Sequence, residues 1–291
     1  MTPNAPTILS QTGAALDYDA VALVFADLAV RAGAAVMAVY AGDPHARLKA
    51  DASPVCDADE QAEAIILDGL RARLPGIAVL AEEAASRGEG FCVAPLMILV
   101  DPLDGTREFL SRNGEFTVNV ALIADGVARA GAIYAPAQAR LWFAGATAYV
   151  CDVEPGALLP ASPLWRTIRA RPAPHAGLVA LASRSHSDPQ TEAFLARHHV
   201  SARRNAGSSL KFCLLAEGAA DVYPRFCTTM EWDIAAGDAI LRAAGGVVLG
   251  EDGAPMPYGK TADGYRNAGF VAWGDPQAAA APPLADQFIT R

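Results

Sequence analysis

Apolar side chains occupy nearly every face of the segment Asp17–Tyr40, and small alanines separate the larger ones. A helix that is apolar all round is buried inside a protein, so this segment predicts a buried helix. A second helix is predicted from about Asp57 to Leu74. Its start fits the capping-box pattern with Asp57 as the cap, because Glu60 stands three residues later.

Short apolar runs bounded by turn residues follow the second helix, and each predicts a β-strand. These runs are 77–80, 97–100, 116–123 and 128–134. From about Tyr149 to Ala176 the pattern gives way to Pro, Ala, Gly and Arg, which indicates a domain boundary. We therefore expect an N-terminal α+β domain over residues 1–160 that holds most metal ligands. A C-terminal α/β domain over residues 161–291 would add Asp233 and substrate contacts.

Beyond that boundary the predicted elements alternate between strand and helix. Their order is strand 178–182, helix 188–198, a short strand near residue 200, helix 208–217, strand 221–223, helix 233–244 and strand 247–249. Such alternation is typical of an α/β layer, in which helices cover a sheet. The expected fold class is therefore α/β or α+β.

Composition narrows the function classes. The 291 residues have a formal net charge of −9, which argues against nucleic acid as a partner because phosphate backbones are bound by basic surfaces. No apolar stretch approaches the ~18 residues of a membrane span, and the start lacks a secretory signal pattern. Five scattered cysteines without a C-x-x-C pair favour a cytoplasmic setting. Peripheral association with the inner membrane and a homodimer are left open.

Four carboxylates stand at the ends of predicted elements, two after one strand, one after another strand and one at a helix start. They are Asp101, Asp104, Glu82 and Asp233. Hard cations such as Mg²⁺ prefer oxygen-rich ligand sets, and bound cations would let an acidic protein accept an anionic substrate. Gly105 and Thr106 then lead into a short predicted helix, whose first N–H groups favour an anion. The competing explanation is that Asp-Pro and Asp-Gly simply form turns.

Four motifs in this order and spacing resemble the inositol monophosphatase superfamily of metal-dependent, lithium-sensitive phosphatases. They are Lys49-Ala-Asp-Ala-Ser-Pro-Val-Cys-Asp-Ala-Asp59 with Glu63, Ala81-Glu-Glu83, Asp101-Pro-Leu-Asp-Gly-Thr106 and Trp232-Asp-Ile-Ala-Ala-Gly237. The similarity runs from Lys49 to about Gly246. It implies a layered α-β-α-β-α sandwich with the metal site at the junction of two domains.

Other segments resemble one branch of this superfamily, the 3′(2′),5′-bisphosphate nucleotidases of the bacterial CysQ type. They are Asn113-Gly-Glu-Phe-Thr-Val-Asn-Val-Ala-Leu122, Ser183-Arg-Ser-His186, Gly207-Ser-Ser-Leu-Lys-Phe212 and Tyr223-Pro-Arg225. The branch implies adenosine 3′,5′-bisphosphate, a by-product of sulfate activation, as the substrate. An inositol monophosphatase or another sugar-phosphate phosphatase is the alternative. A non-catalytic sensor of a phosphorylated metabolite would be a different class of protein.

The resemblance also implies roles for single residues. Two or three Mg²⁺ ions would be bound by Glu82, Asp101, the Leu103 carbonyl, Asp104 and Asp233. The expected catalytic group is Glu82 together with Thr106 and Asp59, in which Thr106 hydrogen-bonds to Asp59 and orients or deprotonates the attacking water. Substrate contacts are expected from Asp104, Gly105, Thr106, Ser208, Lys211, Arg225 and Asp233. For Lys211 and Arg225, an ordinary surface charge is the competing explanation.

The chain departs from the family's pattern at two positions near the expected site. Ala81 stands where the family usually has Gly, which affects the loop but removes no ligand. Cys56 stands where the family often has Thr, which puts in doubt a hydrogen bond at the start of the second helix. All expected carboxylates are present, so an inactive relative is not the favoured interpretation.

Overall fold

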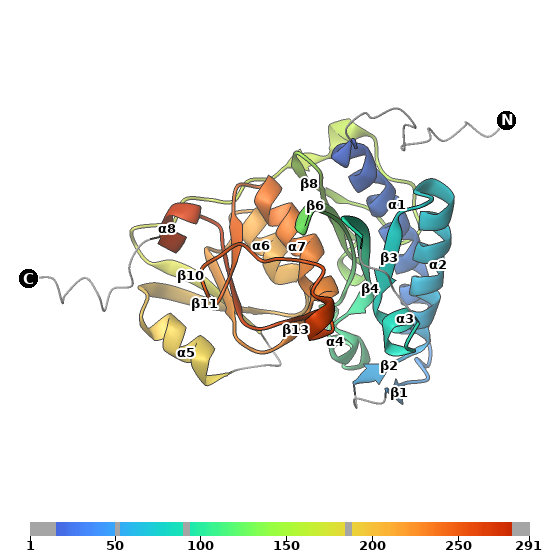
Figure 1. Ribbon diagram of the computed structural model, residues 1–291, viewed down its shortest axis with the longest axis horizontal. Coiled ribbons are helices and arrows are strands. Elements are labelled where there is room, and N and C mark those ends of the chain that lie inside the picture. Colours follow the sequence, from blue (N-terminus) through green and yellow to red (C-terminus); the bar gives the residue numbers. More distant parts are fainter. Residues whose placement is uncertain (1–15, 50–52, 90–93, 184–187, 281–291) are drawn as a thin grey trace, which may run out of the picture.

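The computed structural model describes residues 16–49, 53–89, 94–183 and 188–280, and it is built of two sheets separated and covered by helices (Figure 1). Helices α1 and α2 lie outside the larger sheet, α6 and α7 lie between the sheets, and α5 and α8 lie outside the smaller one. This is the layered α-β-α-β-α arrangement, so the predicted fold class is confirmed. The helices are α1 (Tyr18–Tyr40), α2 (Asp57–Arg73), α3 (Glu82–Ser86), α4 (Thr106–Leu110), α5 (Pro189–Ala196), α6 (Leu210–Ala216), α7 (Glu231–Ala243) and α8 (Pro276–Ala280), with 3₁₀ turns at Pro136–Gln138, Ser162–Leu164 and Thr261–Asp263.

Seven strands form the larger sheet in sequence order: β3 (Ala78–Ala81), β4 (Leu96–Asp104), β5 (Thr117–Ala124), β6 (Val127–Ala135), β7 (Arg140–Ala144), β8 (Ala148–Asp152) and β9 (Arg166–Thr167). Only β3 and β4 are parallel. Alternate residues of β4 enter different cores, since Ile98 packs with α1 and α2 whereas Leu99 packs on the side of α7. Both faces are covered, which explains why the central strands have continuous apolar sequences.

The smaller sheet has the strand order β11-β10-β12-β16-β14. Its strands are β10 (Leu178–Ser183), β11 (Val200–Ala206), β12 (Val222–Arg225), β14 (Val247–Gly250) and β16 (Phe270–Trp273). Two short ribbons complete the described structure: β1 (Arg47–Leu48) with β2 (Pro54–Val55), and β13 (Thr229–Met230) with β15 (Arg266–Asn267). The β13 ribbon precedes α7 and therefore fixes where that helix begins.

Helix α1 begins at the predicted position because the Asp17 side chain accepts the backbone N–H groups of Asp19 and Ala20 at 3.0 and 3.1 Å. By length and mean hydropathy, 1.8 over its most apolar window, this helix would also pass as a membrane span. However, 61% of that window is buried inside the protein, where α1 packs against α2 and the larger sheet. Its apolar surface is thus accounted for by the core.

Several strands were not predicted. The sequence pattern assigned no strand to β7, β9 or β16, and the region expected to hold the domain boundary contains most of β8 and all of β9. The larger sheet therefore continues to Thr167, through strands too short to show a clear apolar period. The division of the chain at residue 160 stays a prediction.

Candidate active site

An irregularity in β4 separates the two aspartates that follow its apolar run. Asp101 pairs with Asn119 of β5 and Asp104 pairs with Thr117, so β4 has one residue more than its partner over this stretch. Pro102 lies in the extra segment and cannot donate to the ladder, which is the usual setting of a β-bulge. Gly105 then adopts a φ of 92°, a left-handed conformation that suits glycine, and turns the chain into α4.

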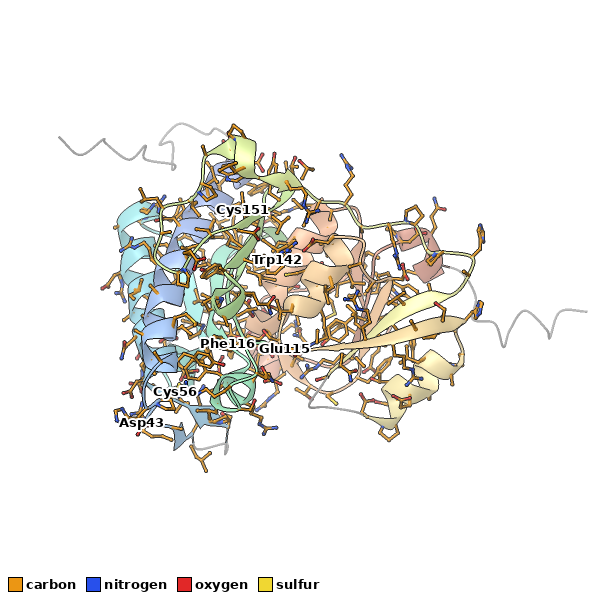
Figure 2. The ribbon with its side chains drawn as sticks, turned by 180° about the vertical axis from the view of Figure 1, so that it is seen from behind. Asp43, Cys56, Glu115, Phe116, Trp142 and Cys151 are labelled. Atoms are coloured by element: carbon orange, nitrogen blue, oxygen red, sulfur yellow. The ribbon has the colours of Figure 1, made fainter. Side chains whose placement is uncertain are left out.

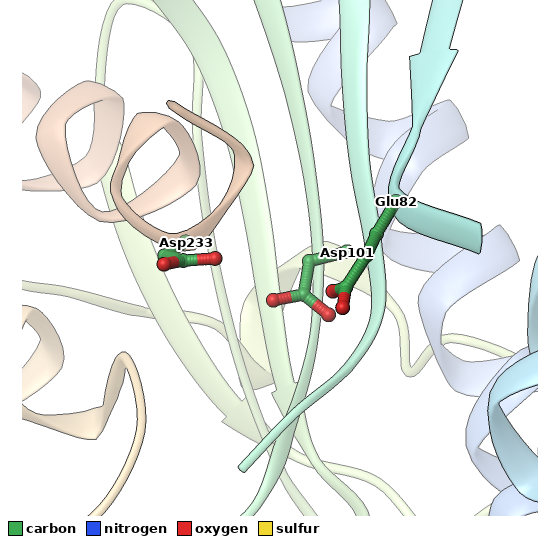
Figure 3. Close-up of side chains that lie close together, drawn as sticks. All are labelled: Glu82, Asp101 and Asp233. Carbon is green, nitrogen blue, oxygen red and sulfur yellow. The ribbon is translucent and has the colours of Figure 1, made fainter. Parts of the chain in front are cut away.

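Three carboxylates from different elements converge at the end of β4 (Figure 3). Glu82 begins α3 directly after β3, Asp101 is in β4, and Asp233 lies in the first turn of α7. One oxygen of each lies within 4.8 Å of the others. These oxygens are hard ligands at a separation that one divalent cation can bridge, so the donor set fits Mg²⁺.

Burial and mutual repulsion disfavour charge on these acids. Burial raises the pKa of Asp101 well above its usual value, and the neighbouring Glu82, Asp104 and Asp233 raise it further. Burial likewise raises the pKa of Asp233, with added repulsion from Asp104 and Glu82. A bound divalent cation would remove this conflict by neutralising the carboxylates.

Lys49 binds this acidic region and was not predicted as a site residue. Its Nζ lies 2.7 Å from Glu82 Oε1 and 2.6 Å from Glu83 Oε1. Although burial alone would lower the Lys49 pKa, the two glutamates raise it overall. The only sign in the sequence was the position of Lys49 at the head of the first family motif.

Asp104 is oriented by the turn before α6. Its Oδ2 accepts the Ser208 hydroxyl and the Ser209 backbone N–H, each at 2.7 Å. Ser208 Oγ also lies 2.5 Å from Thr117 Oγ1, and Ser209 Oγ donates to Asn119 Oδ1 at 2.9 Å. Because the single Ser208 hydroxyl proton is donated to Asp104, Ser208 accepts from Thr117. These hydroxyl groups therefore hold the turn before α6 against the expected metal ligand.

Thr106 and Asp59 meet as expected. The Thr106 hydroxyl lies 3.3 Å from Asp59 Oδ1 and 3.4 Å from the Leu103 carbonyl oxygen. Asp59 is buried in the first turn of α2, and burial raises its pKa to about 7 against the opposing hydrogen bonds of Cys56. The helix cap itself was predicted one residue too late: Cys56 is the cap, and Asp59 closes the capping box by accepting the Cys56 backbone N–H.

Two cations act on the acidic cluster: burial raises the pKa of Asp104, and Lys211 and Arg225 oppose that rise. Lys211 is buried, donates to the carbonyl oxygens of Ala206 and Ser208 at 3.0 and 2.6 Å, and lies over the Tyr223 ring. Arg225 makes one long contact with the Tyr223 hydroxyl at 3.5 Å, and its buried Nε lacks a hydrogen-bond partner among the described residues. Neither side chain is a surface charge, so that competing explanation is wrong.

These groups surround one cavity of about 280 Å³. The expected metal and substrate residues all line it: Glu82, Asp101, Leu103, Asp104, Gly105, Thr106, Ser208, Lys211, Arg225 and Asp233. Asp59 lies behind Thr106, and His186 is outside the described residues. Residues of the wall or its support that were not singled out include Ser209, Thr117 and Asn119, although all three belong to segments that resembled the nucleotidase branch. The individual roles stay predictions.

The change from Gly to Ala at position 81 is accommodated without strain. Ala81 has φ −115° and ψ 146°, an extended conformation that any residue adopts, and it pairs with Val100 inside the sheet. The chain can therefore enter α3 without a glycine, and Glu82 keeps its place beside Asp101.

Comparisons with known proteins point to one family of phosphatases. The 3′(2′),5′-bisphosphate nucleotidase CysQ of Escherichia coli strain K12 is 42% identical over 245 residues, which cover 84% of this chain and 95% of that protein. The crystal structure of CysQ from Bacteroides thetaiotaomicron, a bacterial member of the inositol monophosphatase family, is 38% identical and covers 88% of this chain and 97% of that one, with a TM-score of 0.72. An inositol monophosphatase from Zymomonas mobilis, 22% identical over 91% of this chain and 97% of its own, shares the fold with a TM-score of 0.71.

Residues 17–281 match the inositol monophosphatase family, which is metal-dependent. The match includes both sheets and all the elements that line the cavity. The chain belongs to the inositol monophosphatase family and is a phosphatase.

Proposed function

We propose that this chain is a Mg²⁺-dependent 3′(2′),5′-bisphosphate nucleotidase that removes the 3′-phosphate of adenosine 3′,5′-bisphosphate. The observation that carries the proposal is that Lys211 and Arg225 line the same cavity as Glu82, Asp101, Asp104 and Asp233. A substrate with two phosphates needs both sets of side chains, since metal-bridging carboxylates suit the reacting phosphate and cations suit the second. The name of the CysQ relatives supports this choice of substrate.

The metal ligands in this proposal are Glu82, Asp101, Asp104, Asp233 and the Leu103 carbonyl. When bound, Mg²⁺ supplies charge neutralisation and makes water more acidic. The chain's own contribution is to hold the ligands from three separate elements within bridging distance, as the 4.8 Å limit for Glu82, Asp101 and Asp233 indicates. The use of two or three ions is part of the proposal.

Thr106 and Asp59 provide the route for the proton of the attacking water. Water transfers a proton to Thr106 Oγ1 while the Thr106 proton moves to Asp59 Oδ1, 3.3 Å away. The water oxygen forms the new bond to phosphorus, the bond to the 3′-oxygen breaks, and the departing 3′-oxygen takes up a proton from solvent. The raised pKa of Asp59, about 7, suits a base that works near neutral pH.

Arg225 and Lys211 are the proposed ligands of the second phosphate, with Ser208 nearby, while Gly105 and Thr106 would contact the reacting phosphate. Arg225 has donors to spare, because its Nε finds no partner among the described residues. An oxyanion there would supply the missing hydrogen bonds and pair with a buried guanidinium.

Phosphate release from a panel of substrates tests the proposal. We expect Mg²⁺-dependent release fastest from adenosine 3′,5′-bisphosphate and inhibition by lithium.

A matched pair of substrates, with and without the second phosphate, tests the contact to that phosphate. Arg225→Met should raise the KM for adenosine 3′,5′-bisphosphate about tenfold and leave the KM for 3′-AMP nearly unchanged. Faster turnover of inositol 1-phosphate or fructose 1,6-bisphosphate would refute the nucleotidase assignment. Tight binding without turnover would favour the sensor. The cytoplasmic setting and the homodimer stay predictions.

A further inference from the structure

Cys56 is a buried thiol that neither the metal ligands nor the substrate contacts use. It lies between β2 and α2, is fully buried, and is not part of the cavity wall (Figure 2). Its Sγ lies 3.0 Å from Asp59 Oδ2, and its backbone N–H donates to the same oxygen at 2.8 Å. The position where a family threonine often stands thus still provides a side-chain donor.

The two oxygens of Asp59 have different neighbours. Oδ2 receives both Cys56 donors, so Oδ1 is the oxygen that faces the Thr106 hydroxyl. Thr106 has one proton and a second acceptor, the Leu103 carbonyl oxygen, only 0.1 Å farther away (3.4 against 3.3 Å). The orientation of the Asp59 carboxylate therefore decides whether the Thr106 proton points along the route that the proposed reaction needs.

The thiol keeps its proton under ordinary conditions. Burial raises the pKa of Cys56 to about 12, with Asp59 adding to the rise. At neutral pH the S–H is therefore available as a donor, although a weak one by comparison with a hydroxyl.

We propose that Cys56 is a positioning residue for catalysis: its S–H fixes Asp59 Oδ2 and thereby aims Oδ1 at Thr106. The inference rests on the proposed proton route through Thr106 and Asp59. The Cys56 proton stays on sulfur throughout, while one proton passes from water to Thr106 and one from Thr106 to Asp59. With the backbone N–H of Cys56 alone, Asp59 Oδ2 would be held by one hydrogen bond, and the carboxylate could turn about its Cβ–Cγ bond.

The test compares two variants of equal shape, Cys56→Thr with a donor and Cys56→Val without one. Both fit the extended backbone at this position, φ −142° and ψ 177°. We expect Cys56→Thr to keep the wild-type kcat, and Cys56→Val to lower kcat about tenfold at saturating Mg²⁺ with KM within about twofold. Cys151→Val is the control, because this buried thiol lies at the opposite end of the larger sheet (Figure 2).

A merely structural role would give a different result. If Cys56→Val lowers only the thermal midpoint, Cys56 serves only as a helix cap and the inference is wrong. The inference is also wrong if Cys56→Thr loses as much kcat as Cys56→Val. Raman spectra give a readout independent of turnover, since the S–H band lost in Cys56→Thr should lie at lower frequency than the band lost in Cys151→Val. All kinetics use the phosphomonoester that the wild type hydrolyses fastest, so a wrong substrate assignment leaves this test intact.

Discussion

Two groups of buried carboxylates in this protein differ in what surrounds them. Asp221 receives two hydrogen bonds from Arg171, at 2.7 and 2.8 Å, and another from the Val179 backbone at 2.7 Å. Asp101 is equally buried but has acids as its nearest charged neighbours, and its one donor among the described residues is the Leu103 N–H at 3.0 Å. Breaking a buried ion pair such as that of Asp221 with Arg171 destabilises the fold, whereas a cluster of buried acids such as that around Asp101 is typical of a functional site.

Of the substitutions that test this comparison, Asp101→Asn should have the largest effect on the rate of phosphate release. The amide keeps the shape and can still accept the Leu103 N–H, but it binds a divalent cation poorly. We expect phosphate release at saturating Mg²⁺ to fall about 10³-fold or more, as for the loss of a group that stabilises the transition state. Thermal unfolding without Mg²⁺ should be unchanged or shifted upward, because one repulsive charge is gone. Retained activity would mean that Asp101 is not a ligand.

Asp221→Asn is the matching substitution at the acid that is paired with a cation, and it should affect stability instead of activity. The same chemical change removes the charge that holds Arg171, so we expect a loss of about 2 kcal/mol in the free energy of unfolding, measured in urea. The loss is moderate because the Arg171 side chain is 38% exposed and can regain water. The kcat of the folded fraction should stay at the wild-type value. A large drop in kcat with unchanged stability would contradict the contrast.

Removing metal should make stability depend on pH. Burial, then mutual repulsion, raises the folded-state pKa values of Asp101 and Asp233 above their unfolded values. The folded protein therefore holds protons that the unfolded chain has lost, and this contribution to stability falls as pH rises from about 4 through the raised values. With EDTA, the thermal midpoint should be lower at about pH 8 than at about pH 6, and saturating Mg²⁺ should add about 2.7 kcal/mol at 100 times its Kd. A midpoint at about pH 8 that Mg²⁺ leaves unchanged would argue against a metal site at this cluster.

The resemblance to the family is what singled out the four acids, because strand ends and a helix start are equally consistent with ordinary turns and caps. The residues that support these acids could not be predicted. Lys49 pairs with acids 33 and 34 residues away, and Thr117 meets Ser208 across 91 residues, so only the folded chain brings them together. Lys211 was expected to contact substrate, but a surface charge stayed open as an explanation because local sequence cannot show that α6 is packed between two sheets. Similarly, β7 and β16 have strand partners but no distinctive pattern of their own.

The burial of α1 has a consequence for how the chain is made. This helix is the first described element to leave the ribosome, yet its main partners besides α2 are β6 and β7, which begin about a hundred residues later. Until those strands are synthesised, the 23-residue apolar segment has mainly α2 to cover it, and the face that packs on the sheet stays open. The nascent chain therefore presents a surface of the kind that chaperones bind, and shortened products that end before β6 should be insoluble.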